Sequence, residues 1–417
     1  MTRNRWASLV LVSVLLLLVL PPRQARGYNG ALTQAYCEGT LNGNWVSGSS
    51  FDTCTIPSGN TGEVPSGDIL TLMYETGPYN YQDIVVESGA TLNVNGKLEC
   101  HTGVLTNKGT LNVGAYDRSN GYISVQARAA DPLYPGKLIN EGTVTNNGLI
   151  SAGRDGTVGS QLWNELGATF HNNGDVDIST VFDFITPGFL NVGTFNNNAG
   201  ADFTVREGGE ARNRGLFEND GLVTLYNYFE AADADLPHEG QHEFHNDVGG
   251  TIELWHWTGT PADNGYLYTD SGVTFTNDGT ITVHDNRCLT WLHCGTNNGT
   301  ITNDGEWRIE NDFFNAATGV FTNQEDLYCW SGGRLHNDGL LVNQSFMATN
   351  GDGGYHEQRP DDVAVRLHSG AQEQQWHDHQ QWPAEQHRGK HTARRPARNP
   401  ADWTHDAHRR IRFDGHL

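Results

Sequence analysis

The stretch LINEGTVTNNGLI, residues 138–150, decides the fold of this 417-residue chain. A unit of the form apolar-x-Asn-x-Gly-x-apolar-x-apolar occurs in it twice, with Asn140 and Asn146 six residues apart. Apolar residues alternate with polar ones on both sides of each Asn-x-Gly, which is the two-residue period of a β-strand. Because Gly accepts the positive φ of a tight bend and Asn caps local backbone, each Asn-x-Gly is predicted to join two short strands.

The same unit recurs as LTNKGTLNV from Leu105, FHNNGDVDI from Phe170, FENDGLVTL from Phe217, FTNDGTITV from Phe275 and NNGTITNDGEWRI from Asn297. Counted once per larger unit, the asparagines lie 20 to 31 residues apart, a spacing typical of a solenoid. We therefore expect an all-β fold, a parallel β-helix, in which stacked asparagines form an inward ladder and satisfy backbone groups of neighbouring coils. A β-sandwich of hairpins would need turns every 8–12 residues and no common coil length.

Residues 1–27 are expected to be a secretory signal peptide. Two arginines precede an apolar run over residues 6–20, and Ala25 and Gly27 fit the small residues of a cleavage site. The run is shorter than the roughly 20 residues that a membrane span needs, and no second long apolar run follows. The mature chain is therefore expected to be secreted or displayed at the cell surface, with no transmembrane segment of its own.

The mature chain is expected to contain three further segments. Residues 28–83 lack the repeat and form an N-terminal cap, since a solenoid exposes an unpaired sheet edge at its end. Residues 84–350 form the β-helix. Residues 351–417 form a tail that is expected to be disordered, because it is rich in charges and poor in apolar patterning.

The tail carries a trace of the repeat in another reading frame. If the reading frame across QWHDHQQW, residues 375–382, is shifted by dropping the first base, the genetic code restricts which residue can stand at each position. NGTITNDG, residues 298–305, fits these restrictions at every position except Asp304. We therefore expect residues 351–417 to be out of frame after a one-base insertion or deletion. The natural continuation would be more of the same solenoid.

Charge and cysteine content limit the partners. The net charge is −23, whereas phosphate binding needs clustered Lys and Arg, so no nucleic-acid partner is expected.

All six cysteines lie in the exported part, where disulfides form. The possible local pairs are Cys37 with Cys54 and Cys288 with Cys294, although the sequence leaves the connectivity open. Zinc at Cys288, Cys294 and the nearby histidines fits no standard ligand spacing.

Over residues 84–350 the chain resembles exported parallel β-helix proteins of the adhesin and autotransporter-passenger type, which are built from Asn/Gly/Thr-rich repeats. The resemblance implies a secreted or surface-displayed protein with an adhesive or structural role and no catalysis. Its partners would be extracellular glycans or other cell-surface components. A carbohydrate-active β-helix, as a polysaccharide lyase or glycoside hydrolase, and a non-catalytic glycan-binding solenoid remain the alternatives.

Candidate binding residues are aromatic. Trp255 and Trp257 follow the inward Ile252 and Leu254 with outward parity, so two neighbouring indoles could stack on sugar rings. Trp291 lies in a later coil and would extend this platform. No catalytic residue is assigned, because the acids fill outward places in the repeat, and no cofactor is expected. A single Gly/Asp stretch, NGDGGY from Asn350, is the one pointer to calcium.

Overall fold

The computed structural model describes residues 37–39, 46–47, 54–55, 62–64, 66–67, 69–72, 83–100, 103–115, 121–128, 131–153, 160–179, 187–231, 242–256, 264–330, 332–350 and 354–357. The chain divides into two units, Met1–His368 and Ser369–Leu417, and all described residues belong to the first. The predicted signal peptide and nearly all of the predicted out-of-frame tail therefore lie outside the described residues.

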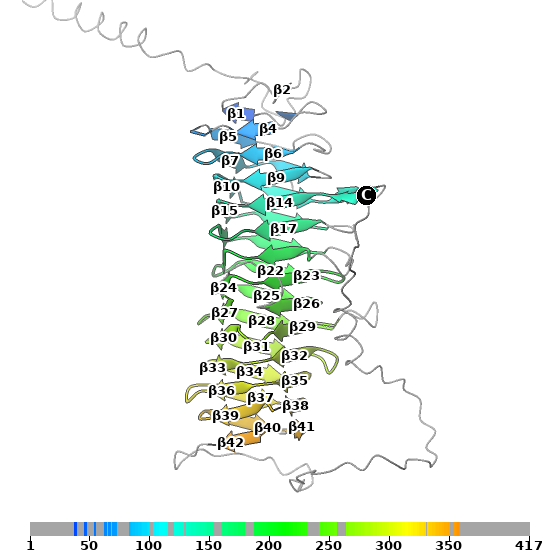
Figure 1. Ribbon diagram of the computed structural model, residues 1–417, viewed down its shortest axis with the longest axis vertical. Coiled ribbons are helices and arrows are strands. Elements are labelled where there is room, and N and C mark those ends of the chain that lie inside the picture. The colour runs from blue at the N-terminus through cyan, green and yellow to red at the C-terminus, as the bar shows by residue number, and fades with distance from the viewer. Residues whose placement is uncertain are drawn as a thin grey trace, which may run out of the picture. The chain divides into compact units, whose positions relative to one another are not determined.

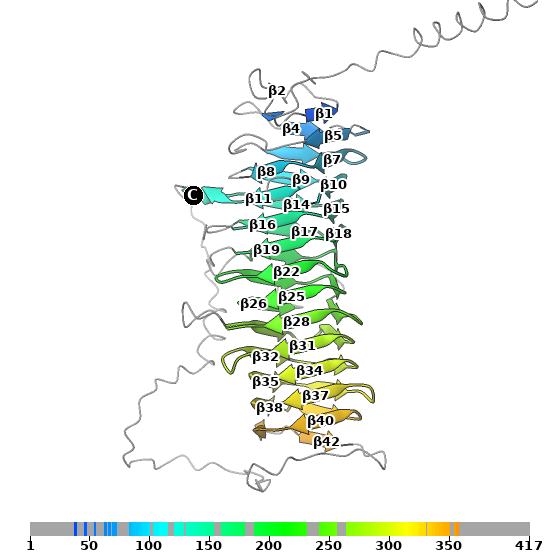
Figure 2. The ribbon, with the colours of Figure 1, turned by 180° about the vertical axis from the view of Figure 1, so that it is seen from behind.

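Three long sheets make up the first unit (Figures 1 and 2). Sheet I has 14 strands, which are β1 (Cys37–Gly39), β5 (Ile69–Leu72), β7 (Thr91–Val94), β10 (Thr110–Val113), β15 (Thr143–Asn146), β18 (Thr169–Asn172), β21 (Thr194–Asn197), β24 (Leu216–Asn219), β27 (Glu243–Asn246), β30 (Thr274–Asn277), β33 (Gly295–Asn297), β36 (Asp312–Asn315), β39 (Arg334–Asn337) and β42 (Gly354–Glu357). Sheet II has 11 strands, which are β8 (Lys97–Cys100), β11 (Tyr122–Val125), β16 (Leu149–Ala152), β19 (Asp175–Ile178), β22 (Asp202–Val205), β25 (Leu222–Leu225), β28 (Thr251–Leu254), β31 (Thr280–Val283), β34 (Thr300–Asn303), β37 (Val320–Asn323) and β40 (Leu340–Asn343).

Sheet III has 13 strands, which are β4 (Gly62–Val64), β6 (Ile84–Val86), β9 (Val104–Asn107), β14 (Lys137–Asn140), β17 (Gln161–Asn164), β20 (Phe189–Asn191), β23 (Glu210–Asn213), β26 (Tyr228–Ala231), β29 (Tyr266–Thr269), β32 (Leu289–Leu292), β35 (Glu306–Ile309), β38 (Asp326–Trp330) and β41 (Met347–Asn350). Two antiparallel pairs complete the strands, namely β2 (Val46–Ser47) with β3 (Cys54–Thr55) and β12 (Ala127–Arg128) with β13 (Asp131–Pro135).

From β7 onward the chain passes from sheet I to sheet II to sheet III in each coil, apart from the small β12–β13 pair, and neighbouring coils pair in parallel. The register is regular, as in Val144 opposite Phe170 and Asn146 opposite Asn172. No helix occurs among the described residues. The prediction of a parallel β-helix is confirmed. Strand β1 is an exception, because it pairs antiparallel with β5 at the N-terminal edge of sheet I, inside the segment expected to be a cap.

The core consists of apolar side chains enclosed by the three sheets, and its middle part contains a column of stacked aromatic rings. In sheet I the rings of Phe170, Phe195, Phe217, Phe244 and Phe275 follow one another at centroid distances of 4.9 to 5.5 Å. This distance is close to the usual strand spacing of about 4.8 Å, so each coil adds one ring to the stack. All five are at most 1 % exposed. Alternation within each strand thus delivers one apolar side chain per coil to the same place.

The predicted asparagine ladders exist at all three corners. In each step one side-chain amide donates to the Oδ1 of the asparagine in the next coil, at 2.6 to 2.8 Å. The amide also donates to a backbone carbonyl, as from Asn146 to Asp175 O at 2.9 Å. The members are Asn107, Asn140, Asn164, Asn191 and Asn213 between sheets III and I, Asn146, Asn172, Asn197, Asn219, Asn246, Asn277, Asn297, Asn315 and Asn337 between sheets I and II, and Asn303, Asn323 and Asn343 between sheets II and III.

The reason predicted for the glycine of Asn-x-Gly is wrong. The repeat glycines, such as Gly148 and Gly279, do not have positive φ. A Cβ on Gly279 would instead lie 2.2 Å from Gly250 O and 2.5 Å from Asp247 O, in the preceding coil. Glycine is required here because the backbones of successive corners pack against each other. Positive φ occurs at other turns, for example at Gly200, where φ is 84° and nothing lies within 4 Å.

Candidate functional site

The three predicted glycan-binding tryptophans have different positions. Trp255 directly follows β28, where sheet II leads towards sheet III, and 36 % of its surface is exposed. Trp291 is half-buried within β32, on the outer face of sheet III. Trp257 lies outside the described residues. The structure therefore does not bring Trp255 and Trp291 onto one sheet.

Trp255 is held in one orientation by its neighbours. Its indole stacks on the imidazole of His284, with centroids 3.6 Å apart and planes 12° from parallel. Its Nε1 donates to Glu253 Oε2 at 2.8 Å, and the other oxygen of Glu253 lies 3.9 Å from His284 Nε2. The register explains the stack, because Leu254 pairs with Val283 and places the two rings in successive coils.

The backbone around Trp255 is also fixed. Trp255 N donates to Leu225 O at 2.9 Å, and Trp255 O accepts from Gly265 N at 3.0 Å. An isolated antiparallel bridge joins His256 to Asn264, so the chain returns next to its departure point. The Arg287 guanidinium, from the turn before β32, contacts His256 Nε2. We call Glu253, Trp255, His256, His284 and Arg287 the Trp255 cluster.

A second group of aromatic and charged side chains covers sheet III. Tyr228 stacks on Tyr266 at 4.8 Å, and Trp291 meets the ring of Tyr268 at 5.8 Å and 89°. The guanidinium of Arg308 lies 5.2 Å from the Trp291 ring and 5.3 Å from the Trp330 ring. Trp291 thus packs within this ladder through cation–π and edge contacts.

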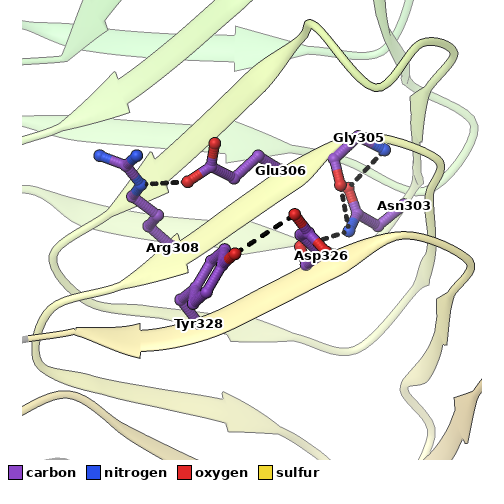
Figure 3. Close-up of polar contacts among 6 residues, drawn as sticks. All are labelled: Asn303, Gly305, Glu306, Arg308, Asp326 and Tyr328. Atoms are coloured by element: carbon purple, nitrogen blue, oxygen red, sulfur yellow. Dashed lines mark hydrogen bonds and ion pairs between the residues drawn. The ribbon is translucent and has the colours of Figure 1, made fainter. Parts of the chain in front are cut away.

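Polar contacts fix the same face near its C-terminal end (Figure 3). Arg308 Nε donates to Glu306 at 2.5 Å, and the Tyr328 hydroxyl donates to Asp326 Oδ2 at 3.3 Å. At the adjoining turn Asn303 donates to the backbone oxygens of Gly305 and Asp326, each at 3.1 Å. The sequence does contain a signal for this ladder, namely outward aromatic and charged residues that alternate in successive coils. This signal can be recognised only when the register between the coils is known.

Buried charges on sheet III are paired. Arg212 contacts Glu210 within its own strand and Glu230 Oε2 of the next coil at 3.2 Å. Burial raises the pKa of Glu230, although the attraction of Arg212 opposes this shift. Burial also raises the pKa of Tyr228 well above its usual value. Both carboxylates are held by one guanidinium, so they do not flank an open space as the two acids of a glycosidase do.

His293 forms a charged pair at the following corner. Its Nε2 lies 2.6 Å from Glu310 Oε2, and its Nδ1 lies 2.7 Å from Thr269 O. Burial lowers the pKa of His293, but the hydrogen bonds to Glu310 and Thr269 outweigh it, so the pKa is raised. Protonated His293 therefore stabilises the fold. This contribution is complete below the pKa of about 6.5 that histidine has in the unfolded chain, and it is lost as the pH rises through the raised pKa of the folded state.

The predicted disulfide between Cys288 and Cys294 is wrong, because both thiols are free. Cys288 is fully buried before β32, whereas Cys294 lies beyond that strand and its thiol contacts Val273 O at 3.1 Å. An extended strand of four residues separates them by more than the 7 Å that a disulfide tolerates between Cα atoms. Burial raises the pKa of the Cys288 thiol to about 12. The side chains of the other predicted pair, Cys37 and Cys54, lie outside the described residues.

Among the described residues no group of three or more His, Cys, Asp or Glu side chains is arranged to hold a metal ion. In the same part of the chain, no helix is long and apolar enough to cross a bilayer. The stretch from Asn350 that pointed to calcium lies mostly outside the described ranges.

Comparisons with known proteins give one match. No protein-family model matches the chain. No curated protein matches it significantly. Among solved structures, the chain is similar to a crystal structure of a TibC-catalysed, hyperglycosylated fragment of TibA, with 14 % identity and a TM-score of 0.28 over 73 % of this chain and 94 % of that one. The similarity concerns architecture alone and carries no argument about function.

Proposed function

We propose that this protein is a secreted or surface-displayed solenoid with an adhesive or structural role and no catalytic activity. The observation that carries the proposal is the unbroken parallel stack from β5 to β42 in sheet I, which spans about 60 Å at the usual strand spacing. Buried asparagine ladders follow its corners over most of this length. Such a stack holds outward side chains at fixed, repeated positions, which suits a contact surface.

The charges on the outer faces support the absence of catalysis. The buried carboxylates of sheet III, Glu210 and Glu230, are neutralised by Arg212. The acids at the corners, such as Asp220 and Asp338, are exposed. Catalytic acids and bases need environments that push their pKa values apart at one reacting bond. The export of the chain rests on the sequence of residues 1–27 alone.

The test has two parts. Beads coated with the full mature chain are expected to adhere under flow to surfaces that carry extracellular matrix or cell-wall material, while beads coated with heat-unfolded chain are not. In parallel, the protein is expected to release neither reducing ends nor unsaturated uronates from pectin, alginate or hyaluronan. Turnover of any of these polymers above the unfolded control would refute the proposal, and so would equal retention of folded and unfolded coatings.

A further inference from the structure

We propose that the Trp255 cluster is a binding site for a neutral pyranose residue of an extracellular glycan. The inference rests on the proposed adhesive function and names the ligand class for one site on it. Trp255 is the one tryptophan among the large hydrophobic residues that are exposed in the described part of the chain, with 36 % of its surface accessible. An exposed indole offers a flat apolar surface of the kind that the C–H face of a pyranose covers.

Preorganisation is the first argument for a binding site. The indole is clamped by the stack on His284 at 3.6 Å and by the hydrogen bond of Nε1 to Glu253 at 2.8 Å. Its backbone is tied to two neighbouring segments. A side chain that is already ordered loses little conformational entropy when a ligand covers it. A flexible surface tryptophan would lose up to about tenfold in affinity through this ordering.

The second argument is the carboxylate beside the ring. A carboxylate offers about four lone-pair sites, and in Glu253 one hydrogen bond to Trp255 and one longer approach to His284 are seen. The remaining sites of Glu253 lie next to the indole, where they can accept hydrogen bonds from sugar hydroxyls. Stacking and hydroxyl recognition thus come from side chains two residues apart on one strand.

Charge selects among sugars. The chain carries a net charge of −23, and Glu253 places one of its anions directly beside the ring. Arg287 keeps its charge but contacts His256, whereas the group that holds the indole is the carboxylate of Glu253. A uronic or sialic acid would therefore be repelled at short range, whereas a neutral hexose or pentose would not. The inferred ligand is a neutral glycan that exposes an apolar pyranose face.

A matched control exists on sheet I. Phe314 in β36 is 45 % exposed and stacks on His336 of the next coil at 4.6 Å and 12°. There the carboxylate two residues earlier, Asp312, is bound to the histidine at 2.9 Å. The ring has no polar atom that holds a carboxylate beside it. Phe314 therefore reports what any exposed, His-stacked aromatic ring contributes to binding.

The experiment uses the full mature chain on a printed array of neutral oligosaccharides with their uronic-acid and sialylated counterparts. Calorimetry with the strongest neutral ligand then gives dissociation constants. Trp255→Ala is expected to weaken binding at least about tenfold and Trp255→Phe a few-fold, because phenylalanine keeps a ring but loses the Nε1–Glu253 hydrogen bond. Glu253→Gln is expected to weaken binding several-fold, and Phe314→Ala is expected to leave it unchanged. Far-UV circular dichroism checks that each variant is folded.

The inference is overturned if the array shows no neutral ligand, if Trp255→Ala binds like the parent chain, or if Phe314→Ala loses as much affinity as Trp255→Ala. The bead assay separates this failure from that of the proposed function. Beads of Trp255→Ala that still adhere like the parent leave the adhesive role standing and place its contact surface elsewhere. Sugar binding by a chain whose beads do not adhere would support the site and refute the adhesive role.

Discussion

Replacing Asn197 by leucine is expected to be among the most damaging changes of similar volume in the solenoid. Asn197 is 1 % exposed and stands in the middle of the ladder between sheets I and II. Its amide donates to Asn219 Oδ1 at 2.7 Å and to Leu222 O at 3.0 Å, and its Oδ1 accepts from Asn172 at 2.8 Å. Leucine keeps the branched shape of the side chain but is larger, and it removes these three hydrogen bonds and the longer one to Ala201 O at 3.5 Å.

The cost follows from the groups that lose a partner. In the variant, Asn219 Oδ1 and Leu222 O each lose the Asn197 donor, while the Asn172 amide loses one acceptor and still donates to Asp202 O at 3.1 Å. Each buried polar group without a partner costs about 1–3 kcal/mol, so the expected loss from the two acceptors is about 2–6 kcal/mol. Apolar burial by the new side chain offsets only part of this loss.

Asn337 provides the comparison at the end of the same ladder. It accepts from Asn315 at 2.7 Å and donates to Gly339 O at 3.2 Å, and Glu357 stands opposite it in the next coil. Two hydrogen bonds are lost instead of four, so Asn337→Leu is expected to cost about half as much as Asn197→Leu.

The assay is hydrogen exchange followed by mass spectrometry, supported by guanidinium unfolding monitored at the β-sheet band of circular dichroism. Exchange is preferred because a solenoid opens coil by coil and need not unfold in two states. The local opening free energy is expected to fall in the coils of Asn172, Asn197 and Asn219. The reasoning is refuted if Asn197→Leu costs less than about 1 kcal/mol, below the cost of one unpaired buried group, or no more than Asn337→Leu.

Four further predictions address other links between sequence and structure. Gly279→Ala is expected to prevent native packing, because its Cβ would lie 2.2 Å from a backbone oxygen, whereas Gly200→Ala is expected to cost only about 1–2 kcal/mol of backbone strain; comparable melting temperatures for the two variants would contradict this. The melting temperature is expected to be higher at pH 6 than at pH 8, since the raised pKa of His293 places its stabilising charge at the acidic side, and His293→Asn should reduce this difference. Burial and Asp220 raise the pKa of Asp247, so further acidification is expected to relieve repulsion there, seen as higher amide protection factors in its coil after correction for the intrinsic exchange rate at each pH. Sequencing the gene across the codons for residues 343–372 is expected to reveal a one-base difference, and a verified frame would end that interpretation.

Much of the fold follows from the repeat alone. The alternation around Asn140 and Asn146 fixes which side chains point inward, and the inward amides of successive coils then meet because their strands pair in register. The role of the repeat glycines was not predictable in the same way. It depends on the distance between the backbones of successive corners. The sequence of a single coil does not reveal this distance. Local conformational preference suggested positive φ, and packing between coils requires the absence of a Cβ.

The outer surface was less predictable for a related reason. Parity correctly placed Trp255 outside, but its partner His284 lies 29 residues later, across a loop whose length gives no register. Trp291 was expected to extend the platform because it lies in a later coil. Trp255 directly follows a strand of sheet II, whereas Trp291 lies within a strand of sheet III, and a single coil does not reveal which sheet each strand joins. The cysteines illustrate the same limit. Cys288 and Cys294 are close in the sequence, but an extended strand lies between them and holds them too far apart in space for a disulfide.

The ladder and the candidate site depend on one register. Asn246 and Asn277 join the two coils that carry Trp255 and His284, through a hydrogen bond of 2.6 Å. A slip of one residue between these coils would move His284 by about 3.3 Å along its strand and turn its side chain to the other face. The 3.6 Å stack beneath the indole would then be lost, although no residue of the Trp255 cluster had changed. Buried amides that contact no ligand therefore determine whether the exposed ring is presented in a binding orientation.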